Sequence, residues 1–457
     1  MSAESYDVVV VGGGTGGAFA AATTAKAGLD TVILERKPAE DAGHIACGDA
    51  IKGTATFPEV IDLDYLKAES FTNQSVMRAV FENPLTDEDI EIGFRGPGAV
   101  LDRKRYGEVI LEEAERLGSE IHYDTVVQDV TQAADGTVTG VTGTHKGKAV
   151  DYDAEVVIDA AGALSILQEE TDFAGTHFDT NVRYSQFCSA YREVIEVDEP
   201  VDWDDAIVFK PTEQLGYLWY FPRTPTRINV GVGFQMDQPE MQMISAIEKD
   251  IESRPDLKNP TVVDKLGAAV PTRRPYDSAV APGYVAVGDA AGHVNPTTGG
   301  GIPGAAKSAH WAAKRAIAAI EAGDVSEAAL WEYNRDVMAD FGKHFAAIDC
   351  YNIWGTAHDV EELTEIVSAV PAQHLADAMA GKDTGPMGLS LKLRTIKDTF
   401  GHWDDLLDLA RVRRKTNALV DHYERYPTSP EGFPAWQSFR DDLMDEIYEI
   451  SGADPKY

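Results

Sequence analysis

The chain has 457 residues, enough for two domains or one large elaborated domain, and its 44% hydrophobic residues can form a substantial core. With 76 acidic and 40 basic residues, the net charge of −36 argues against nucleic acid or an anionic bilayer surface as an electrostatic partner. The acidic residues are scattered over most exposed-looking segments, so we interpret them as a solvated coat suited to a high-salt cytoplasm. An acidic docking surface for a basic partner is the alternative interpretation.

The three cysteines, Cys47, Cys188 and Cys350, lie far apart and form no CxxC pair. This spacing argues against an iron–sulfur cluster or a structural zinc site, and we expect no bound metal. A low cysteine count is typical of a reducing cytoplasm. The uncharged residues 8–25 contain several glycines and follow no basic segment, so we expect strand, turn and helix there rather than a membrane span.

The N-terminal segment has the pattern of a dinucleotide-binding unit. Residues 6–11 form a continuous apolar, β-branched run, which predicts a parallel strand buried on both faces. A glycine-rich turn, a helical stretch and a second strand follow, and that strand ends in an acid 23 positions after Gly12, where a ribose-binding carboxylate belongs. The fingerprint residues are Gly12, Gly14, Gly17 and Glu35. They favour the adenosine diphosphate moiety of FAD or NAD with an unphosphorylated ribose.

Residues 44–53 show no clean periodicity, and we expect a loop there. Its Cys47 is either a reactive thiol beside a cofactor or a small buried residue, and the local sequence alone favours the buried residue, since free cysteines are commonly buried. Farther on, we expect a helix over residues 107–117, strands over 121–130 and 138–141, and a buried strand over 154–160. Strands that return to the nucleotide-binding sheet after an excursion predict one interrupted domain.

Residues 181–235 alternate in polarity and are rich in Tyr, Phe and Trp, which predicts an antiparallel sheet. Its aromatic side chains fit a platform over an apolar ligand, or equally the ordinary core of a sheet. Short helices are expected over residues 241–252 and 261–266. From residue 302 onward the pattern is mostly helical, with breaks expected at Pro371, Pro386 and Pro427.

Residues 283–302, GYVAVGDAAGHVNPTTGGGI, predict a short buried strand over 284–287, a turn at Asp289, a glycine run and the start of an alanine-rich helix. A carboxylate at a strand end can accept sugar or ribityl hydroxyls, and a helix N-terminus can face an anionic oxygen. Three consecutive glycines let a flat or charged ligand approach the backbone. Together with the N-terminal fingerprint, this segment predicts the second half of a flavin site.

The order of these motifs resembles the FAD-binding flavoproteins of the para-hydroxybenzoate hydroxylase type, and within them the geranylgeranyl reductase family. Three segments carry the resemblance over about the first 330 residues: ACGD at 46–49, YLWYFP at 217–222 for the family's YxWxFP, and the flavin segment GDAAGxxNPxxGGGI at 288–302. Two positions depart from the pattern. Ala50 stands where relatives often have glycine, and Tyr106-Gly107 meets only half of the aromatic–acid pattern expected after an arginine.

The resemblance implies a role for each matched residue. On the nucleotide side, Gly12, Gly14 and Gly17 would hold the pyrophosphate, Glu35 the adenosine ribose, Val127 the adenine through its backbone, and Arg103 a phosphate or ribityl oxygen. On the flavin side, Asp289 would bind ribityl or phosphate-proximal oxygens, Gly301 and Ile302 would offer N–H groups to the pyrimidine edge, and Cys47 and Gly48 would lie beside the isoalloxazine. Tyr217 and Trp219 would be walls of an isoprenoid tunnel, and with Cys47 they are the candidate catalytic residues.

The fold expected from the resemblance is a mixed α/β fold. A Rossmann-like FAD-binding domain is interleaved with an antiparallel-sheet substrate domain, and a helical region follows at the C-terminus. The expected FAD-binding domain comprises residues 1–60, 100–165 and 270–325; the substrate domain comprises 61–99 and 166–269; the C-terminal region comprises 326–457.

The implied activity is that of an FAD-dependent oxidoreductase acting on CH–CH groups, which hydrogenates isolated C=C bonds of geranylgeranyl chains on ether phospholipids in the lipid biosynthesis of a halophilic archaeon. An isolated alkene has no carbonyl to accept charge, so we expect protonation of one carbon and hydride delivery from flavin N5 to the other. An apolar, aromatic-walled site would stabilise the developing cation. The candidate proton donors are Cys47, Tyr217 and an ordered water.

A flavin-dependent monooxygenase or halogenase on the same chassis is the alternative, with Lys52 as its catalytic lysine. A non-catalytic, FAD-stabilised lipid carrier is the second alternative. We expect an isoprenoid lipid substrate and an external electron donor, which could be NAD(P)H, ferredoxin or a deazaflavin. The expected location is the cytoplasm, with peripheral membrane contact through the apolar mouth of the tunnel.

Overall fold

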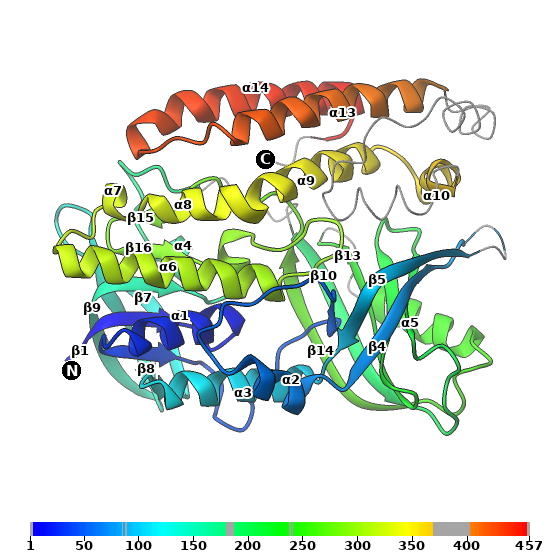
Figure 1. The fold of residues 1–457 in the computed structure, drawn as a ribbon, viewed down its shortest axis with the longest axis horizontal. Helices are drawn as coiled ribbons and strands as arrows, with labels where there is room; N and C mark the ends of the chain where they lie inside the picture. The colour runs from blue at the N-terminus through cyan, green and yellow to red at the C-terminus, as the bar shows by residue number, and fades with distance from the viewer. Residues whose placement is uncertain are drawn as a thin grey trace.

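The computed structural model describes residues 3–454 except 85, 87–88, 180–186, 237–238, 240 and 369–402. Two eight-stranded sheets lie side by side, helices cover the first sheet, and two long C-terminal helices form a further layer above them (Figure 1). This arrangement of sheets and helices confirms the predicted mixed α/β fold class. The division into three regions at the residue boundaries given above stays a prediction.

The first sheet has a parallel core. Its strand order is β15-β16-β9-β1-β2-β6, and β7 and β8 extend it from β9 as an antiparallel meander. Residues 8–11 are buried because both faces of this strand are covered, which explains the unbroken run of valines. The strands are β1 (Ala3–Val11), β2 (Thr31–Leu34), β6 (Glu120–His122), β7 (Thr125–Gln132), β8 (Val138–His145), β9 (Lys148–Asp159), β15 (Val280–Ala281) and β16 (Tyr284–Ala286).

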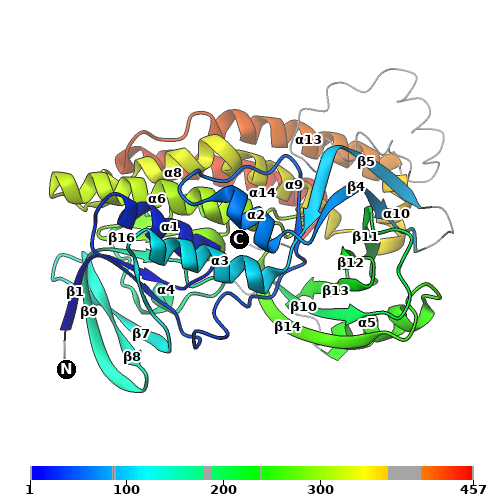
Figure 2. The ribbon, with the colours of Figure 1, turned by 60° about the horizontal axis from the view of Figure 1, so that its bottom comes forward.

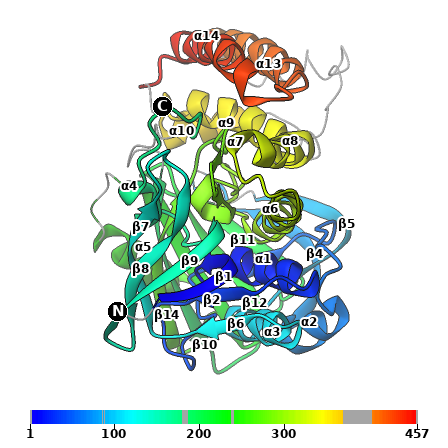
Figure 3. The same ribbon diagram turned by 90° about the vertical axis from the view of Figure 1, so that its left-hand side faces the viewer.

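Helix α1 (Thr15–Lys26) lies between α3 (Arg103–Arg116) and α6 (Ile302–Ala322) on one face of this sheet (Figure 3). The buried faces of α1 and α6 are dominated by alanine, so the two helices can approach closely. Two shorter helices, α2 (Leu63–Ser70) and α4 (Ile166–Glu170), pack on α3 and β7 respectively.

The second sheet has the order β14-β10-β13-β12-β11-β4-β5-β3, and α5 (Met241–Ser253) packs on β10 and β13 (Figure 2). It is antiparallel, as predicted, except that β11 runs parallel to β4. Its strands are β3 (Ala50–Ile51), β4 (Asn73–Phe81), β5 (Ile90–Val100), β10 (Phe187–Glu196), β11 (Ala206–Pro211), β12 (Tyr217–Thr224), β13 (Arg227–Gln235) and β14 (Thr261–Pro271).

The described part of the chain after α6 is mostly helical, as predicted. α13 and α14 pack against each other and against α9 (Figure 1). The elements are α7 (Glu327–Leu330), α8 (Glu332–Val337), a π-helical turn η3 (Met338–Gly342), α9 (Lys343–Gly355), α10 (Val360–Ser368), α13 (Trp403–Tyr423), a 3₁₀ turn η4 (Pro430–Gly432) and α14 (Phe433–Ser451). Pro427 lies in the break between α13 and η4, whereas Pro371 and Pro386 lie outside the described residues. Within the described ranges, no helix is both long and apolar enough to cross a membrane.

Three local predictions were wrong. Residues 261–266 form the first part of strand β14 rather than a helix, because they pair with β10 at the edge of the second sheet. Helix α3 begins at Arg103 and not at residue 107, since the side chain of Asp102 caps it by accepting the N–H groups of Lys104 and Arg105. The expected loop over residues 44–53 contains the short strand β3, which pairs with β5.

A buried ionic cluster joins the C-terminal helices to the rest of the molecule. The carboxylate of Asp277 is fully buried, and its Oδ2 lies 2.7 Å from Nη1 of Arg274 and 2.6 Å from Nη1 of Arg440 on α14. The hydroxyl of Tyr423 on α13 donates to the same carboxylate, and the hydroxyl of Tyr426 donates to the Asp277 carbonyl. These contacts position α13 and α14 over the layer beneath them.

We expect Asp277→Ala to lower the free energy of unfolding by about 3–5 kcal/mol, because two buried guanidinium groups lose their carboxylate. Urea unfolding in molar salt measures this loss. The matched control is Asp336→Ala, which breaks a half-exposed pair with Arg315 and should cost less than about 1 kcal/mol. Equal losses in the two variants would contradict the anchoring role of Asp277.

Candidate functional site

A cavity of about 2380 Å³ lies between the glycine-rich turns of the first sheet, one face of the second sheet and the helices after α6. Pockets for a single small ligand usually measure about 300–1,000 Å³, so this cavity has room for a dinucleotide and a second large ligand. The predicted site residues that line it are Gly12, Gly14, Glu35, Cys47, Gly48, Arg103, Val127, Tyr217, Trp219, Asp289, Gly301 and Ile302. The structure therefore brings together all predicted site residues except Gly17.

Gly17 does not line the cavity but lies within α1, packed against the turn that precedes the helix. A Cβ at this position would be 1.8 Å from the carbonyl oxygen of Gly12, so only glycine lets the turn close onto the helix. Gly17 therefore shapes the turn, and the neighbouring glycines line the cavity; its predicted contact with a pyrophosphate stays a prediction.

The turn after β1 presents backbone groups to the cavity. Gly12 has a φ of +103°, which favours glycine, and Gly14 begins α1 without a side-chain cap. Glu35, at the end of β2, accepts the N–H of Gly13 at 2.7 Å and the N–H of Lys37 at 2.9 Å. A carboxylate has about four acceptor sites, so Glu35 can still accept ribose hydroxyls.

Arg103 links the turn to the interior of the site. It is 3% exposed; its Nη2 donates to Thr15 at 3.2 Å, and its guanidinium carbon lies 4.8 Å from the centre of the Tyr106 ring. Among the described residues, its Nη1 has no hydrogen-bond partner. A buried guanidinium with an unsatisfied donor beside an uncapped helix N-terminus suits an anionic ligand.

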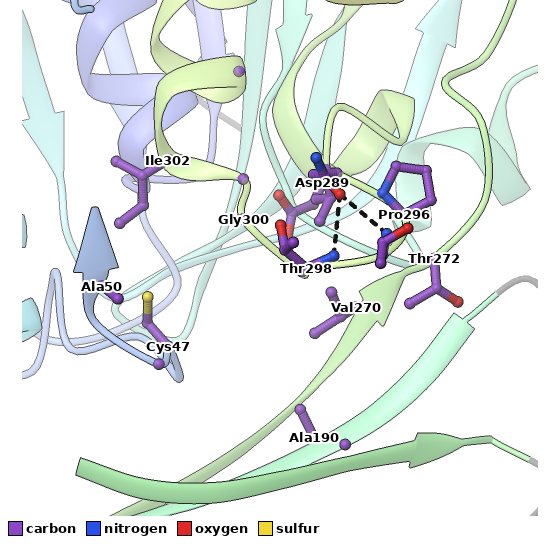
Figure 4. Close-up of a pocket in the computed structure, with 18 of the residues that line it drawn as sticks. Cys47, Ala50, Ala190, Val270, Thr272, Asp289, Pro296, Thr298, Gly300 and Ile302 are labelled. Carbon is purple, nitrogen blue, oxygen red and sulfur yellow. Dashed lines mark hydrogen bonds between the residues drawn. The ribbon is translucent and has the colours of Figure 1, made fainter. Parts of the chain in front are cut away.

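The second glycine-rich segment forms the opposite rim of this end of the cavity. Asp289 lies in the 3₁₀ turn η2 (Gly288–Ala291), and Gly301 precedes α6, which also has no side-chain cap (Figure 4). The Asn295 side chain accepts the N–H groups of residues 297 and 298 at 3.1 and 3.0 Å and so holds the intervening loop. Burial raises the pKa of Asp289 to about 6, and the positive charge of Arg103 opposes this rise.

Cys47 lies on the same side of the cavity as Ala50 and Ile302, away from Thr272 (Figure 4). Its Sγ accepts the backbone N–H of Asp49 at 3.2 Å. Burial and the nearby Asp49 carboxylate raise the pKa of the Cys47 thiol. The thiol is therefore protonated at neutral pH, which suits a proton donor better than a nucleophile.

Asp49 and Arg223 form a buried ion pair that sequence analysis did not single out. Asp49 is 0% exposed with a φ of +71°, and its Oδ2 accepts Nε and Nη2 of Arg223 at 2.9 and 2.7 Å. The left-handed backbone of Asp49 carries strain, which these charge-assisted hydrogen bonds offset. The two residues are 174 positions apart, so no local pattern connects them.

A second cluster of charged side chains ties the loop of residues 44–49, here called the Cys47 loop, to the second sheet. His44 Nε2 lies 2.9 Å from Oδ2 of Asp264 on β14, and the buried Arg192 on β10 donates to the same oxygen. Sequence analysis missed all three residues, because Asp264 fell in a predicted helix and the partners lie on different elements. Together with the Asp49–Arg223 pair, this cluster holds the Cys47 loop at two points.

Trp219 and Phe221 on β12 pack under the Cys47 loop, with their rings stacked at 6.3 Å between centroids. A Cβ at Gly48 would be 2.9 Å from the Phe221 ring, and a Cβ at Gly231 would be 2.1 Å from the Trp219 ring. Glycine at both positions gives the aromatic rings their space. The predicted aromatic platform is thus part of the cavity wall.

Tyr217 contacts the loop on the flavin side of the predicted site. Its hydroxyl donates to the carbonyl oxygen of Thr298 at 2.9 Å, and burial raises its pKa above the usual value for tyrosine. Because its one proton is engaged and harder to remove, Tyr217 is suited to hold the loop rather than to supply protons.

The C-terminal region, for which the sequence indicated no role, closes the far end of the cavity. Its lining there is largely apolar and aromatic: Phe341, Phe345, Ile348, Trp354, Leu363 and Leu409. Such a lining suits a long hydrocarbon chain. Among the described residues, no three His, Cys, Asp or Glu side chains are arranged to hold a metal ion.

The model of the FAD binding domain family matches residues 5–340, well over half of the chain. The chain belongs to this FAD-binding family. Among its curated relatives, the digeranylgeranylglycerophospholipid reductase of Sulfolobus acidocaldarius is 27% identical over 98% of this chain and 99% of the relative. The enzyme of the same name from Methanosphaerula palustris is 30% identical over 72% of this chain and 81% of the relative.

Solved structures show the same fold. A geranylgeranyl bacteriochlorophyll reductase-like protein from Thermoplasma acidophilum superposes with a TM-score of 0.69 at 24% identity, covering 90% of this chain and all of that one. A myxobacterial chondrochloren halogenase superposes with a TM-score of 0.61 at 19% identity, covering 87% of this chain and 97% of that one. At these identities the likeness concerns the fold, which reductases and halogenases share.

The residues of this FAD-binding protein fit the cofactor. Two helix N-termini without side-chain caps, at Gly14 and Gly301, border one cavity together with the unsatisfied guanidinium nitrogen of Arg103. The carboxylates of Glu35 and Asp289 line the same cavity and can accept hydroxyl groups. The helix N-termini and the guanidinium suit anionic phosphates and the flavin edge, and the carboxylates suit sugar hydroxyls.

Two alanine variants separate ligand contact from folding in the first turn. Gly14→Ala should leave the stability of the apoprotein unchanged, because its Cβ meets only Ile45 at 3.5 Å, but should weaken FAD binding about tenfold by obstructing approach to the backbone. Gly17→Ala should lower the free energy of unfolding by about 1–3 kcal/mol through overpacking. Thermal unfolding measures the stability of each apoprotein variant, and FAD titration measures its affinity. A Gly14→Ala variant that lost stability but kept its FAD affinity, or a Gly17→Ala variant that kept its stability, would contradict these roles.

The pKa of Asp289 predicts a pH-dependent stability of the apoprotein. A folded-state pKa of about 6 lies above that of an unfolded Asp, so the folded state binds more protons between about pH 4 and 6 and loses stability as the pH rises through this window. A shift of about two pKa units corresponds to about 3 kcal/mol, so in molar salt Asp289→Asn should remove a decline of up to about 3 kcal/mol. If the free energy of unfolding declined equally with pH in wild type and variant across this window, Asp289 would not be the group responsible.

Proposed function

We propose that this protein is a geranylgeranyl reductase that hydrogenates isolated C=C bonds in the isoprenoid chains of ether phospholipids. The observation that carries the proposal is a single cavity that joins an FAD-type nucleotide site to an aromatic and apolar chamber, with Cys47 between them. The full-length similarity to the digeranylgeranylglycerophospholipid reductase of Sulfolobus acidocaldarius supports the same substrate class. The net charge of −36 supports a high-salt cytoplasm as its setting.

In the proposed site, the N–H group of Gly14 and the guanidinium of Arg103 would hold the pyrophosphate, and Glu35 would bind the adenosine ribose. Gly12, whose own N–H is donated to the carbonyl oxygen of Leu34 at 2.9 Å, would let the pyrophosphate approach the turn closely. Val127 would contact the adenine through its backbone, and Asp289 would accept ribityl hydroxyls. The N–H groups at Gly301 and Ile302 would be offered to the pyrimidine edge of the flavin, where such donors stabilise negative charge.

Reduced FAD supplies the hydride for the alkene when it is bound in this cavity. The chain's own residues supply the environment: the rings of Trp219 and Phe221 stabilise positive charge on the tertiary carbon, and the apolar lining excludes water. The thiol of Cys47 donates the proton to the other alkene carbon, and the N–H of Asp49 stabilises the resulting thiolate. The engaged hydroxyl of Tyr217 favours Cys47 over Tyr217 as the donor.

The electron donor that reduces the enzyme is external, and NAD(P)H, ferredoxin and a deazaflavin are all compatible with the proposal. The lipid enters from the membrane surface while the enzyme stays in the cytoplasm. A second candidate function is flavin-dependent oxygenation or halogenation, which is favoured by the shared fold of the halogenases and by Lys52 in the cavity wall.

The test is turnover under anaerobic conditions. Enzyme reduced with dithionite in molar salt should add two daltons per double bond to geranylgeranylated phospholipid, as measured by product mass. Cys47→Ala should reduce the rate at least about a hundredfold through loss of general acid catalysis. Cys350→Ala, a buried cysteine outside the cavity wall, is the matched control and should retain the rate.

No mass gain with the reduced wild-type enzyme would overturn the reductase. If admission of air then caused oxygen uptake that depends on an added organic substrate, the oxygenase or halogenase would replace it.

A further inference from the structure

Asn229 on β13 is a polar side chain that contacts the Cys47 loop from the second sheet, and it is 0% exposed. Burying a primary amide is costly unless its donors and acceptor are satisfied. Each of its three hydrogen bonds reaches a different group of the candidate site, so the residue has a role that strand packing alone does not explain.

Its side-chain oxygen accepts the indole N–H of Trp219 at 2.9 Å. Its side-chain nitrogen donates to the backbone carbonyl of Cys47 at 2.9 Å and to the carboxylate of Asp49. The partners fix the orientation of the amide, because the indole can only donate whereas the carbonyl and the carboxylate can only accept. Rotation of the amide by 180° would break all three contacts.

These bonds hold Cys47 from two directions. Asn229 fixes its carbonyl, while the N–H of Asp49 contacts its Sγ, and Asp49 is itself held by Asn229 and Arg223. Trp219, the aromatic wall beneath the loop, is attached to the same amide. One side chain therefore links the backbone of Cys47 to the indole of Trp219.

We propose that Asn229 is a positioning residue that locks the Cys47 loop onto Trp219 and so sets the orientation of the thiol toward the cavity. This inference rests on the proposed function for its catalytic consequence, but not for its geometry. Without the amide, the loop keeps the Arg223 and Asp264 contacts but loses the hold on the Cys47 carbonyl, and the thiol gains freedom and solvent.

The test is the pH profile of Cys47 alkylation by iodoacetamide, followed by peptide mass spectrometry on the oxidised holoenzyme in molar salt. The charged groups that act on this thiol are Asp49, which raises its pKa, and Arg103 and Arg192, which lower it. In Asn229→Leu, the Cys47 loop should open and expose the Cys47 thiol to solvent. The midpoint of the alkylation profile should then fall by about one pH unit, which makes alkylation at pH 8 about tenfold faster. Lipid reduction should lose about tenfold in kcat with little change in KM.

The matched control is Asn334→Leu. Asn334 is 2% exposed and makes two comparable buried hydrogen bonds, to Ala279 and Ser278, but does not line the cavity. Its Cys47 profile should overlay that of the wild type. An unchanged profile in Asn229→Leu, or an equal shift in Asn334→Leu, would overturn the proposal.

If Asn229→Leu does not fold, Asn229→Asp is the second variant. It has the same shape and keeps an acceptor for Trp219 but loses both N–H donors, so its Cys47 profile should also be displaced, and coincidence with wild type would overturn the proposal. These readouts do not depend on reductase turnover. A failure of the proposed function would appear instead as wild-type enzyme that leaves the lipid unsaturated while the alkylation profiles still differ.

Discussion

The candidate site depends on the burial of the Asp49 carboxylate beneath the Cys47 loop. Burying a charge costs several kcal/mol unless it is paired and hydrogen-bonded, and here Arg223 and Asn229 on the second sheet provide that pairing. The loop leaves the first sheet, yet it is held by the second. Removal of Arg223 would leave the charge of Asp49 uncompensated, whereas removal of Asn229 would leave it with fewer hydrogen bonds, so this ion pair fixes how the cofactor half and the aromatic half of the cavity face each other.

The rest of the fold forms the two ends of the cavity that meet at the Cys47 loop. The uncapped N-termini of α1 and α6 border the nucleotide end of the cavity, and the aromatic rings of β12 form the wall beneath the Cys47 loop. The C-terminal helices, anchored through Asp277, add apolar lining at the far end. A polar end suited to a charged cofactor thus passes into an apolar end suited to a hydrocarbon chain, which is the arrangement that hydride transfer to an isolated alkene requires.

The elements that depend on neighbouring residues in the chain were predicted correctly from the sequence. The valine run of β1, the glycine turn after it and the glycines before α6 are buried or lack a Cβ for reasons visible within about ten residues. Long-range pairing was not visible: β14 resembled a helix because its strand character comes from pairing with β10, about 75 positions away in register. The Asp49–Arg223 pair and the contacts of Asn229 were missed for the same reason.

The most direct test of a cavity that brings a reduced flavin against an isoprenoid alkene is a single turnover without oxygen. Stoichiometrically reduced enzyme is mixed with geranylgeranylated phospholipid, and flavin absorbance near 450 nm is followed. The account predicts that the flavin is reoxidised by the lipid alone and that a fully saturated lipid of the same headgroup has no effect. A flavin that stays reduced with both lipids until air is admitted would contradict it.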